Sequence, residues 1–222
     1  CHFRALPEDF KIRSQMESRY GRKILPAGMA IQDFPVTYED LEPHFDMFEY
    51  VCGTSGRAGV INGQQVEGGN PFEGSHTRDY PLPPNPNYLG AEWFYKAARE
   101  MGYHPYPIPA SNASGPYINP YGCQMGPCNF CGFCSDYGCL NYSKASPNAC
   151  ILPVLRGRKG FELRTHAQVL KVNLTEDRKM ATGVTYLDAQ GRESEQPADI
   201  VILAAFQLYN VHLMLVSGIG TP

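Results

Sequence analysis

The sequence predicts an α/β fold whose first half is α+β, and three features of the 222-residue chain lead to this prediction. Residues 37–53 and 87–101 repeat apolar side chains at helical spacing, and long loops rich in glycine and proline separate them. From about residue 160 onward, short apolar segments alternate with turns and end in a helical pattern. A compact run of cysteines stands between these two parts.

The first helix is expected over residues 37–53. Residues 1–35, which precede it, are polar, contain several prolines and are expected to be irregular. Thr37 is a favourable N-cap residue, and Gly53 follows the last apolar position of the helical pattern. The acidic residues near the start of this helix suit its positive end and are expected to be solvated. They are Glu39, Asp40 and Glu42.

The second helix is expected over residues 87–101. The apolar residues that predict its buried face are Leu89, Trp93, Phe94, Ala97 and Met101. Residues 53–74, between the two helices, are glycine-rich and polar and are expected to form an extended loop. Residues 103–121 are dense in proline and tyrosine, lack periodicity and lead directly into the cysteine run.

After the cysteines, residues 161–172 predict one strand or two abutting strands, and residues 181–187 and 193–196 predict a hairpin. The continuous apolar run 200–205 predicts a strand buried on both faces, followed by a helix that ends at Gly218. This order suits the distal part of a dinucleotide-binding domain. The sequence contains no G-x-G-x-x-G, so the prediction does not depend on a phosphate-binding loop.

Four cysteines, Cys128, Cys131, Cys134 and Cys139, follow one another at intervals of three, three and five residues. The bacterial ferredoxin pattern C-x2-C-x2-C-x3-C, which binds iron–sulfur clusters, differs by one residue in the last gap. A structural zinc site usually takes its thiolates from two Cys-x-x-Cys pairs with a longer stretch between them. The run therefore favours a cluster, while zinc and disulfides or free thiols stay open as alternatives. The other cysteines are scattered: Cys1, Cys52, Cys123 and Cys150.

Composition excludes some functions. With 19 basic and 22 acidic residues the net charge is −3, which gives no electrostatic basis for binding nucleic acid. No apolar run reaches the roughly 18 residues of a membrane span. The chain starts without methionine and stops just after a predicted helix, so we expect it to be an internal piece of a larger polypeptide.

Two segments resemble signatures of the glucose–methanol–choline (GMC) family of flavin oxidoreductases. Residues 202–205, with the helix that ends in residues 213–220, resemble the second signature of that family. Lys144 and Ser146, with Leu152 eight residues after Lys144, fit its R-x-S-x5-L stretch. The resemblance implies part of an FAD-binding, Rossmann-like fold that lacks the N-terminal dinucleotide-binding βαβ unit.

Within the family, the chain is most similar to the flavoprotein subunits of membrane-bound gluconate 2-dehydrogenases and to related sugar dehydrogenases with an iron–sulfur cluster. The segments that carry this similarity are Thr37–Pro43, Gly68–Phe72 and the cysteine run. The resemblance implies three parts: helices and long loops of a cap or substrate region over 1–120, a cluster-binding loop over 121–142, and the distal part of the FAD-binding domain over 143–222.

The resemblance also implies cofactor contacts. For FAD it indicates the backbone of Val169 at the adenine edge, together with Ala204, Ala205 and Ser146. Core packing for the first three, and a helix-capping or loop hydroxyl for Ser146, are the alternative roles. The glycine that follows the alanine pair in the family is Phe206 here.

For the metal centre, the resemblance implies a three-iron or four-iron cluster. Its ligands would come from Cys128, Cys131, Cys134 and Cys139, of which Cys131 is the candidate non-ligand. It implies no catalytic residue in this chain, because the family's histidine with its second His or Asn, and its phosphate loop, lie outside it.

The implied activity is FAD-dependent oxidation of a CH–OH group of a sugar or aldonate, with electrons leaving through the cluster to a haem or quinone acceptor. The implied partners are a cytochrome c subunit and a small accessory subunit, with membrane association only through them, at the periplasmic face of a bacterial inner membrane. A second hypothesis is a non-catalytic zinc or iron–sulfur module whose cysteine loop binds a partner.

Overall fold

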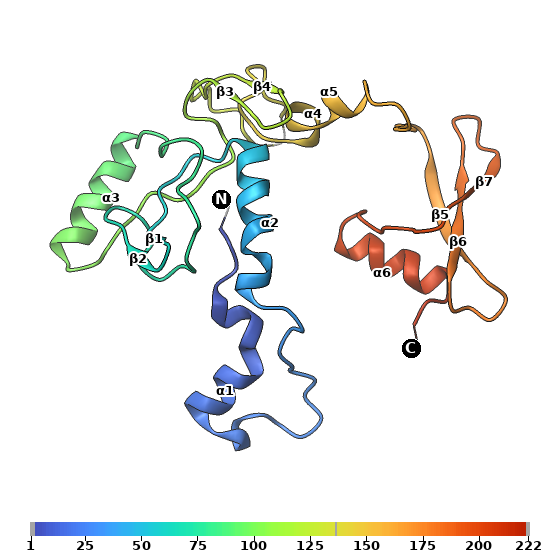
Figure 1. Cartoon of the computed structure of the whole chain (residues 1–222), viewed down its shortest axis with the longest axis horizontal. Coiled ribbons are helices and arrows are strands. Elements are labelled where there is room, and N and C mark those ends of the chain that lie inside the picture. The colour runs from blue at the N-terminus through green and yellow to red at the C-terminus, as the bar shows by residue number, and fades with distance from the viewer. Residues whose placement is uncertain (1–2, 136, 221–222) are drawn as a thin grey trace. The chain divides into compact units, whose positions relative to one another are not determined.

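The computed structural model describes residues 3–135 and 137–220, which divide into two compact units, Cys1–Phe161 and Glu162–Pro222 (Figure 1). Each unit is described by itself. The helices of unit 1 are η1 (Pro7–Lys11), α1 (Ile12–Tyr20), η2 (Arg22–Ile24), α2 (Tyr38–Cys52), α3 (Leu89–Glu100), α4 (Pro147–Cys150) and α5 (Leu152–Leu155). Its strands are β1 (Val60–Ile61), β2 (Gln64–Gln65), β3 (Tyr117–Ile118) and β4 (Gln124–Met125). Unit 2 contains β5 (Gln168–Leu174), β6 (Ala181–Leu187), β7 (Glu193–Pro197) and α6 (Gln207–Val216).

The N-terminal segment is more ordered than its sequence predicts, because it contains the α1 helix. None of the α1 side chains is buried, so the helix has no apolar stripe that a periodicity argument could detect. Polar contacts support it instead: Arg13 Nε donates to Glu17 Oε1 at 2.9 Å, one helical turn away. The expectation of an irregular segment was wrong for this reason.

The predicted helix at 37–53 is confirmed as α2. Thr37 Oγ1 accepts a hydrogen bond from Asp40 N at 3.2 Å, and Asp40 Oδ2 accepts one from Thr37 N at 2.8 Å. In this capping box, each side chain accepts a hydrogen bond from the backbone N–H of the other residue. Gly53 ends the helix in the left-handed region at φ 59°. A Cβ there would lie 2.6 Å from Cδ1 of Tyr117, so the close approach of the β3 side chain also requires glycine.

The second predicted helix is confirmed as α3, but its predicted buried face was wrong. Trp93 is 66% exposed and Phe94 is 71% exposed, and the only buried residue of the helix is Ala98. Leu89 and Met101 are exposed as well. An apolar stripe shows that a helix needs a covering surface, but it does not say where that surface comes from. Within the described residues of unit 1, nothing buries this side of α3.

The core of unit 1 lies where α2 ends. Cys52, Met125 and Cys150 pack together with Ala113, which is fully buried. The β3–β4 hairpin is held to α2 because Tyr117 Oη donates to the carbonyl of Tyr50 at 2.7 Å. The expected loop at 53–74 contains the short β1–β2 hairpin. Figure 1 shows α2 running from the α1 segment to the end of the unit that contains the β3–β4 hairpin.

Unit 2 is an antiparallel sheet in the order β5-β6-β7 with one helix, α6, packed against β5. The predicted hairpin is confirmed as β6 and β7, and the predicted final helix is confirmed as α6, which precedes Gly218. The strand predicted from residue 161 begins only at Gln168. Ser217 Oγ, just past α6, accepts a hydrogen bond from Val172 N at 2.8 Å and so links helix to sheet.

The strand predicted at 200–205 does not form. These residues are irregular, and Ile200 and Ile202 are 78% and 82% exposed. A strand exists only through hydrogen bonds to neighbouring strands, and within the described residues of unit 2 no strand is paired with this segment. The prediction of a strand buried on both faces was therefore wrong for these residues.

Candidate functional site

The cysteine run lies in a loop that is closed at its base by hydrogen bonds around Ala113. The carbonyl of Ala113 accepts from Cys128 N at 2.8 Å and from Ser143 Oγ at 3.2 Å, and its N–H donates to the carbonyl of Ser143 at 3.0 Å. Gly126 N donates to the carbonyl of Asn141 at 3.0 Å. The entry and exit of the loop are therefore held side by side, while residues 131–135 are exposed.

The four thiols of the loop differ in environment. Cys128 and Cys139 are half-buried, Cys131 and Cys134 are exposed, and all four are free. Partial burial alone would raise the pKa of Cys139, but the backbone N–H groups of Lys144, Ser143 and Asn141 donate to its sulfur and leave the pKa below the ordinary value. This environment stabilises the thiolate, which is the form that binds metal.

Two further side chains, Asn112 and Lys144, hold the tip of the loop. Asn112 Nδ2 lies 3.8 Å from Cys134 Sγ, within reach of a weak N–H···S hydrogen bond. The ammonium of Lys144 donates to the carbonyl of Cys134 and, at 3.0 Å, to the carbonyl of Tyr137. A positive charge and N–H donors beside thiols favour an anionic thiolate centre.

The structure does not gather these cysteines into a ready-made metal site. Among the described residues, no group of three or more His, Cys, Asp or Glu side chains is placed to hold one metal ion. The donor set nevertheless fits a thiolate-bound centre, because four free thiols share one loop whose base is fixed and whose N–H groups face sulfur. The ligand set therefore stays a prediction.

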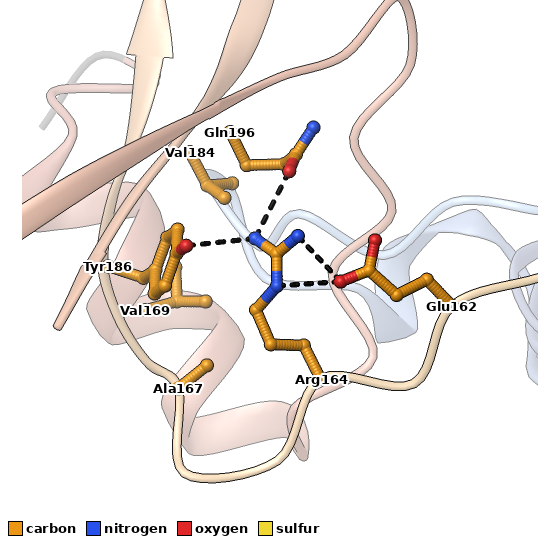
Figure 2. A pocket seen from close by; sticks show the side chains of 7 residues that line it. All are labelled: Glu162, Arg164, Ala167, Val169, Val184, Tyr186 and Gln196. Carbon is orange, nitrogen blue, oxygen red and sulfur yellow. Dashed lines mark hydrogen bonds and ion pairs between the residues drawn. The ribbon is translucent and has the colours of Figure 1, made fainter. Parts of the chain in front are cut away.

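Val169 lies in unit 2 and lines a cavity of about 400 Å³ beside β5 and β6 (Figure 2). The cavity is lined by Glu162, Arg164, Ala167, Val169, Val184, Tyr186 and Gln196. Arg164 crosses it: its guanidinium donates to Glu162 Oε1 at 2.7 Å, to Tyr186 Oη at 2.9 Å and to Gln196 Oε1 at 3.1 Å. The same group stands 5.2 Å from the centre of the Tyr186 ring.

The backbone at Val169 is irregular. Val169 pairs with Tyr186, the next aligned pair joins Lys171 to Thr185, and the shift between them marks a β-bulge. A bulge leaves one residue without a ladder partner and turns the strand locally. Val169 itself is 38% exposed, so it is not a core residue. The structure thus leaves it available to a ligand, without a ligand being present to define its role.

The other residues predicted to contact FAD are also outside the core. Ala204 and Ala205 are exposed and precede α6. Asn210 Oδ1 accepts from Ala205 N at 2.9 Å, and Asn210 Nδ2 donates to the carbonyl of Leu203 at 3.2 Å, so one α6 side chain holds this turn. The next residue, Phe206, adopts φ 70°, the left-handed region that glycine occupies without strain.

Ser146 lies in unit 1, where it is the N-cap residue of α4. Its side chain makes no capping hydrogen bond, and its carbonyl accepts from Ala149 N at 2.9 Å and Cys150 N at 3.0 Å. Ser146 therefore occupies the N-cap position, but the expectation that its hydroxyl caps the helix was wrong.

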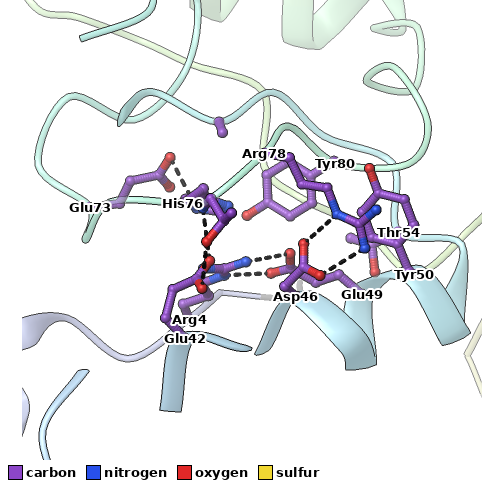
Figure 3. Close-up of polar contacts among 12 residues, drawn as sticks. Arg4, Glu42, Asp46, Glu49, Tyr50, Thr54, Glu73, His76, Arg78 and Tyr80 are labelled. Atoms are coloured by element: carbon purple, nitrogen blue, oxygen red, sulfur yellow. Dashed lines mark hydrogen bonds and ion pairs between the residues drawn. The ribbon is translucent and has the colours of Figure 1, made fainter. Parts of the chain in front are cut away.

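A second polar group, in unit 1, was not predicted from the sequence. Figure 3 shows Arg4 reaching α2, where it donates to both carboxylate oxygens of Glu49 and to Glu42 Oε1 at 3.2 Å. Glu42 also accepts from Thr77 N at 2.8 Å and Thr77 Oγ1 at 2.7 Å, so the expectation that Glu42 is solvated was wrong. Its partners are distant in sequence, and no local pattern indicates them.

His76 belongs to the same region. Its side chain is fully buried, and Nε2 lies 3.4 Å from Glu73 Oε1 (Figure 3). The imidazole also packs edge-on against the Tyr80 ring at 5.1 Å between centres. This group connects the loop after β2 to α2. Among the described residues, neither ring nitrogen of His76 makes a hydrogen bond, so the imidazole is held by packing and by its proximity to Glu73.

Among the described residues, no helix combines the length and apolar character of a membrane span.

The sequence profile of the GMC oxidoreductases matches residues 83–222. This match covers more than half of the chain, and the chain belongs to the GMC oxidoreductase family, whose members are flavoproteins that bind FAD.

Particular relatives are similar over much of the chain. It is 58% identical over 224 residues to "Gluconate 2-dehydrogenase flavoprotein" of Pantoea cypripedii, an alignment that covers all of this chain and 36% of the relative. It is 30% identical over 197 residues to "2-methyl-1,2-propanediol dehydrogenase" of Mycolicibacterium austroafricanum, covering 86% of this chain and 29% of the relative. It is 27% identical over 175 residues to "Paromamine 6'-oxidase" of Streptomyces fradiae, covering 78% and 28%. The chain spans about a third of the length of these relatives.

Proposed function

We propose that this chain is part of an FAD-dependent dehydrogenase that oxidises a CH–OH group of a sugar acid, with gluconate as the reference substrate. The observation that carries the proposal is the 58% identity to the gluconate 2-dehydrogenase flavoprotein over the whole chain, twice the level found with the paromamine oxidase. The substrate assignment follows the first relative, because a shared substrate is expected at that level of identity more than at 27% or 30%.

The flavin contacts proposed for this chain are the Val169 backbone, Ala204 and Ala205, with Ser146 as a fourth. FAD, when bound, supplies the acceptor for a hydride from the CH–OH carbon. The residues of this chain would position it. Val169 stands at a β-bulge beside an aromatic ring and a guanidinium, a setting that suits a planar group. The Asn210 side chain fixes the backbone of the turn that carries the alanines.

The metal centre proposed here is an iron–sulfur cluster of the three-iron or four-iron type. Cys128, Cys134 and Cys139 would be ligands, and Cys131 would be the fourth or a non-ligand. Such a cluster, when bound, carries electrons one at a time, and N–H donors to sulfur tune its potential. The N–H groups around Cys139 and the Lys144 ammonium are the protein's own contribution.

The proposed electron acceptor is haem or quinone, reached through a cytochrome c subunit, with a small accessory subunit as a further partner. Membrane association would come only through these partners, at the periplasmic face of a bacterial inner membrane. These assignments rest on the family resemblance.

The test uses the protein that contains this chain, purified with its partners. Its visible spectrum, iron content and acid-labile sulfide are measured, and gluconate is added without oxygen while flavin absorbance is followed. The proposal predicts flavin bands that bleach with gluconate, together with stoichiometric iron and sulfide. A colourless protein that contains zinc, or flavin that gluconate does not reduce, would contradict it.

A pair of variants separates the cluster from the flavin. Cys134→Ser should leave flavin reduction by gluconate nearly unchanged and slow electron transfer to the haem acceptor. Cys131→Ser is the matched control, since it changes an equally exposed thiol of the same loop, and it should preserve both steps if Cys131 is a non-ligand. Equal loss of both steps in Cys134→Ser would mean that the loop is structural.

A further inference from the structure

Three cysteines that are far apart in sequence converge on one buried side chain, Asn119. Its Nδ2 donates to the carbonyl of Val51, next to Cys52, at 3.0 Å and to the carbonyl of Cys150 at 2.7 Å. Its Oδ1 accepts from Cys123 N at 3.0 Å. A single amide nitrogen can bridge two carbonyls only when their backbones lie close together. The end of α2 and the end of α4 are therefore neighbours.

Of these cysteines, Cys52 and Cys150 face each other. Both belong to the apolar cluster with Ala113 and Met125, and both are 5% exposed. Their side chains pack in this one cluster, and Cys150 Sγ donates to the carbonyl of Ser146 at 3.0 Å. A disulfide needs Cβ atoms about 3.5–4.5 Å apart, so a pair of cysteines must first pack against the same neighbours, as these two do.

Cys123 is the third buried thiol, but its placement is different. Its backbone is committed to Asn119 through both its N–H and its carbonyl, which close the β3–β4 turn. Its side chain is not part of the apolar cluster that contains the other two thiols, although it is near enough to Cys150 to raise the pKa of that thiol. The geometry therefore favours one pair and leaves Cys123 as a free thiol.

We propose that Cys52 and Cys150 form a disulfide when the protein folds in an oxidising compartment. Both thiols lose their protons, a sulfur–sulfur bond forms between them, and the two electrons reduce a disulfide of the oxidant to two thiols. The oxidant is by class a dithiol–disulfide exchange partner, such as a protein disulfide catalyst or oxidised glutathione. The bond would tie the C-terminal end of α2 to α4.

The consequence concerns the cysteine loop. Residues 128–139 lie inside the segment that this bond would enclose, and the loop is anchored by Ala113, a member of the same cluster as the pair. A crosslink there would hold the base of the loop. It would also keep two thiols that are near the loop out of metal binding.

Burial raises the pKa of the Cys52 thiol to about 12, so this thiolate is scarce once the fold has closed. The exchange step is therefore expected during folding rather than after it.

The experiment maps the thiols of the protein isolated without reductant, and of the protein refolded in a buffer of oxidised and reduced glutathione. The samples are denatured in iodoacetamide, digested and analysed by mass spectrometry. We expect a linked peptide pair that contains Cys52 and Cys150, lighter by two hydrogens than the reduced peptides, and carbamidomethylated Cys123. Because wild-type protein is used, the result does not depend on a variant that folds.

Variants give a second readout. Cys123→Ser should retain the linked peptides, whereas Cys150→Ser should leave Cys52 alkylated. A phosphine reductant should lower the melting temperature of the wild type by on the order of 5–10 °C and should have no such effect on Cys52→Ser. Alkylation of both Cys52 and Cys150 in the oxidised samples, or a link from either one to Cys123 or to the loop, would overturn the proposal.

Discussion

Arg4 and Glu49 form a buried ion pair in which Nε and Nη2 of the guanidinium each lie 2.8 Å from a carboxylate oxygen (Figure 3). The side chains are 4% and 3% exposed. A two-bond pair of this kind fixes both position and orientation. It joins the N-terminal segment to the last turn of α2 across 45 residues of sequence, so the start of the described chain is part of the unit 1 interior.

The first prediction follows from this pair. Arg4→Met removes the guanidinium and leaves the Glu49 carboxylate buried without the positive charge that balances it. This change should lower the free energy of unfolding by about 3–5 kcal/mol. The control is Arg13→Met, which removes an exposed one-turn pair with Glu17 and should cost less than about 0.5 kcal/mol. Urea unfolding followed by circular dichroism measures both. Similar losses in the two variants would contradict the buried character of the Arg4 pair.

The second prediction concerns acid stability. Partial burial alone would raise the pKa of Glu42, but hydrogen bonds from Thr77 and Arg4 outweigh it and hold the pKa below the ordinary value of 4.5. A carboxylate whose folded pKa is depressed stabilises the fold above its unfolded pKa, and this stability is lost as the pH falls through the folded value. We expect the free energy of unfolding to decrease as the pH drops below about 4.5. Glu42→Gln should make this dependence on pH less steep.

The check is a series of unfolding curves between neutral and acidic pH for the wild type and Glu42→Gln. Thr77→Val removes the Oγ1 donor at 2.7 Å and should move the NMR-detected pKa of Glu42 upward. A Glu42 pKa that is unchanged in Thr77→Val, or an identical acid slope in Glu42→Gln, would show that these hydrogen bonds do not set the titration.

Sequence reasoning succeeded where the determinants are local. The N-cap at Thr37 and the C-cap at Gly53 lie within one turn of the helix ends that they specify, and the β6–β7 hairpin follows from the turn at Asp188–Gly191. It failed where burial depends on a distant surface. The α3 stripe and residues 200–205 are apolar, yet their covering partners cannot be found from their own pattern.

The candidate site shows the same division. The spacing of the four loop cysteines predicts a shared centre, but the anchor of the loop, Ala113, has no chemistry that would single it out in sequence. Nearly a hundred residues separate Cys52 from Cys150, so their spacing does not predict the apolar cluster and the Asn119 bridge that bring them together. Long-range convergence of this kind is a property of the fold.

The third prediction tests the close approach at the end of α2. Gly53→Ala introduces a Cβ 2.6 Å from the Tyr117 ring in addition to the strain of φ 59°, and should destabilise unit 1 by about 2–4 kcal/mol. Gly63→Ala is the matched control, because φ is 76° there and nothing lies within 4 Å of the added carbon. Its cost should be about 1 kcal/mol, from backbone strain alone. Equal costs in denaturant unfolding would mean that Tyr117 moves aside freely.

The fourth prediction addresses the cysteine loop before any metal is bound. Lys144 donates to the carbonyls of Cys134 and Tyr137. Its ammonium therefore links the tip of the loop to the segment that follows the loop and carries Lys144. Lys144→Met keeps most of the length of the side chain and removes these hydrogen bonds. Amide hydrogen exchange over residues 131–139 should then accelerate by roughly fivefold in the metal-free protein, which corresponds to the loss of a weak, solvent-exposed hydrogen bond.

Lys159→Met is the control, since Lys159 is an exposed lysine of the same unit outside the loop. It should leave exchange in the loop unchanged, and both variants should preserve the exchange of α2. Iron uptake by the apoprotein gives an independent readout, because a loop that samples more conformations loses more entropy when its thiolates gather around one centre. Faster loop exchange with slower or weaker iron uptake in Lys144→Met alone would support a positioning role for Lys144, whereas indistinguishable behaviour of the two variants would rule that role out.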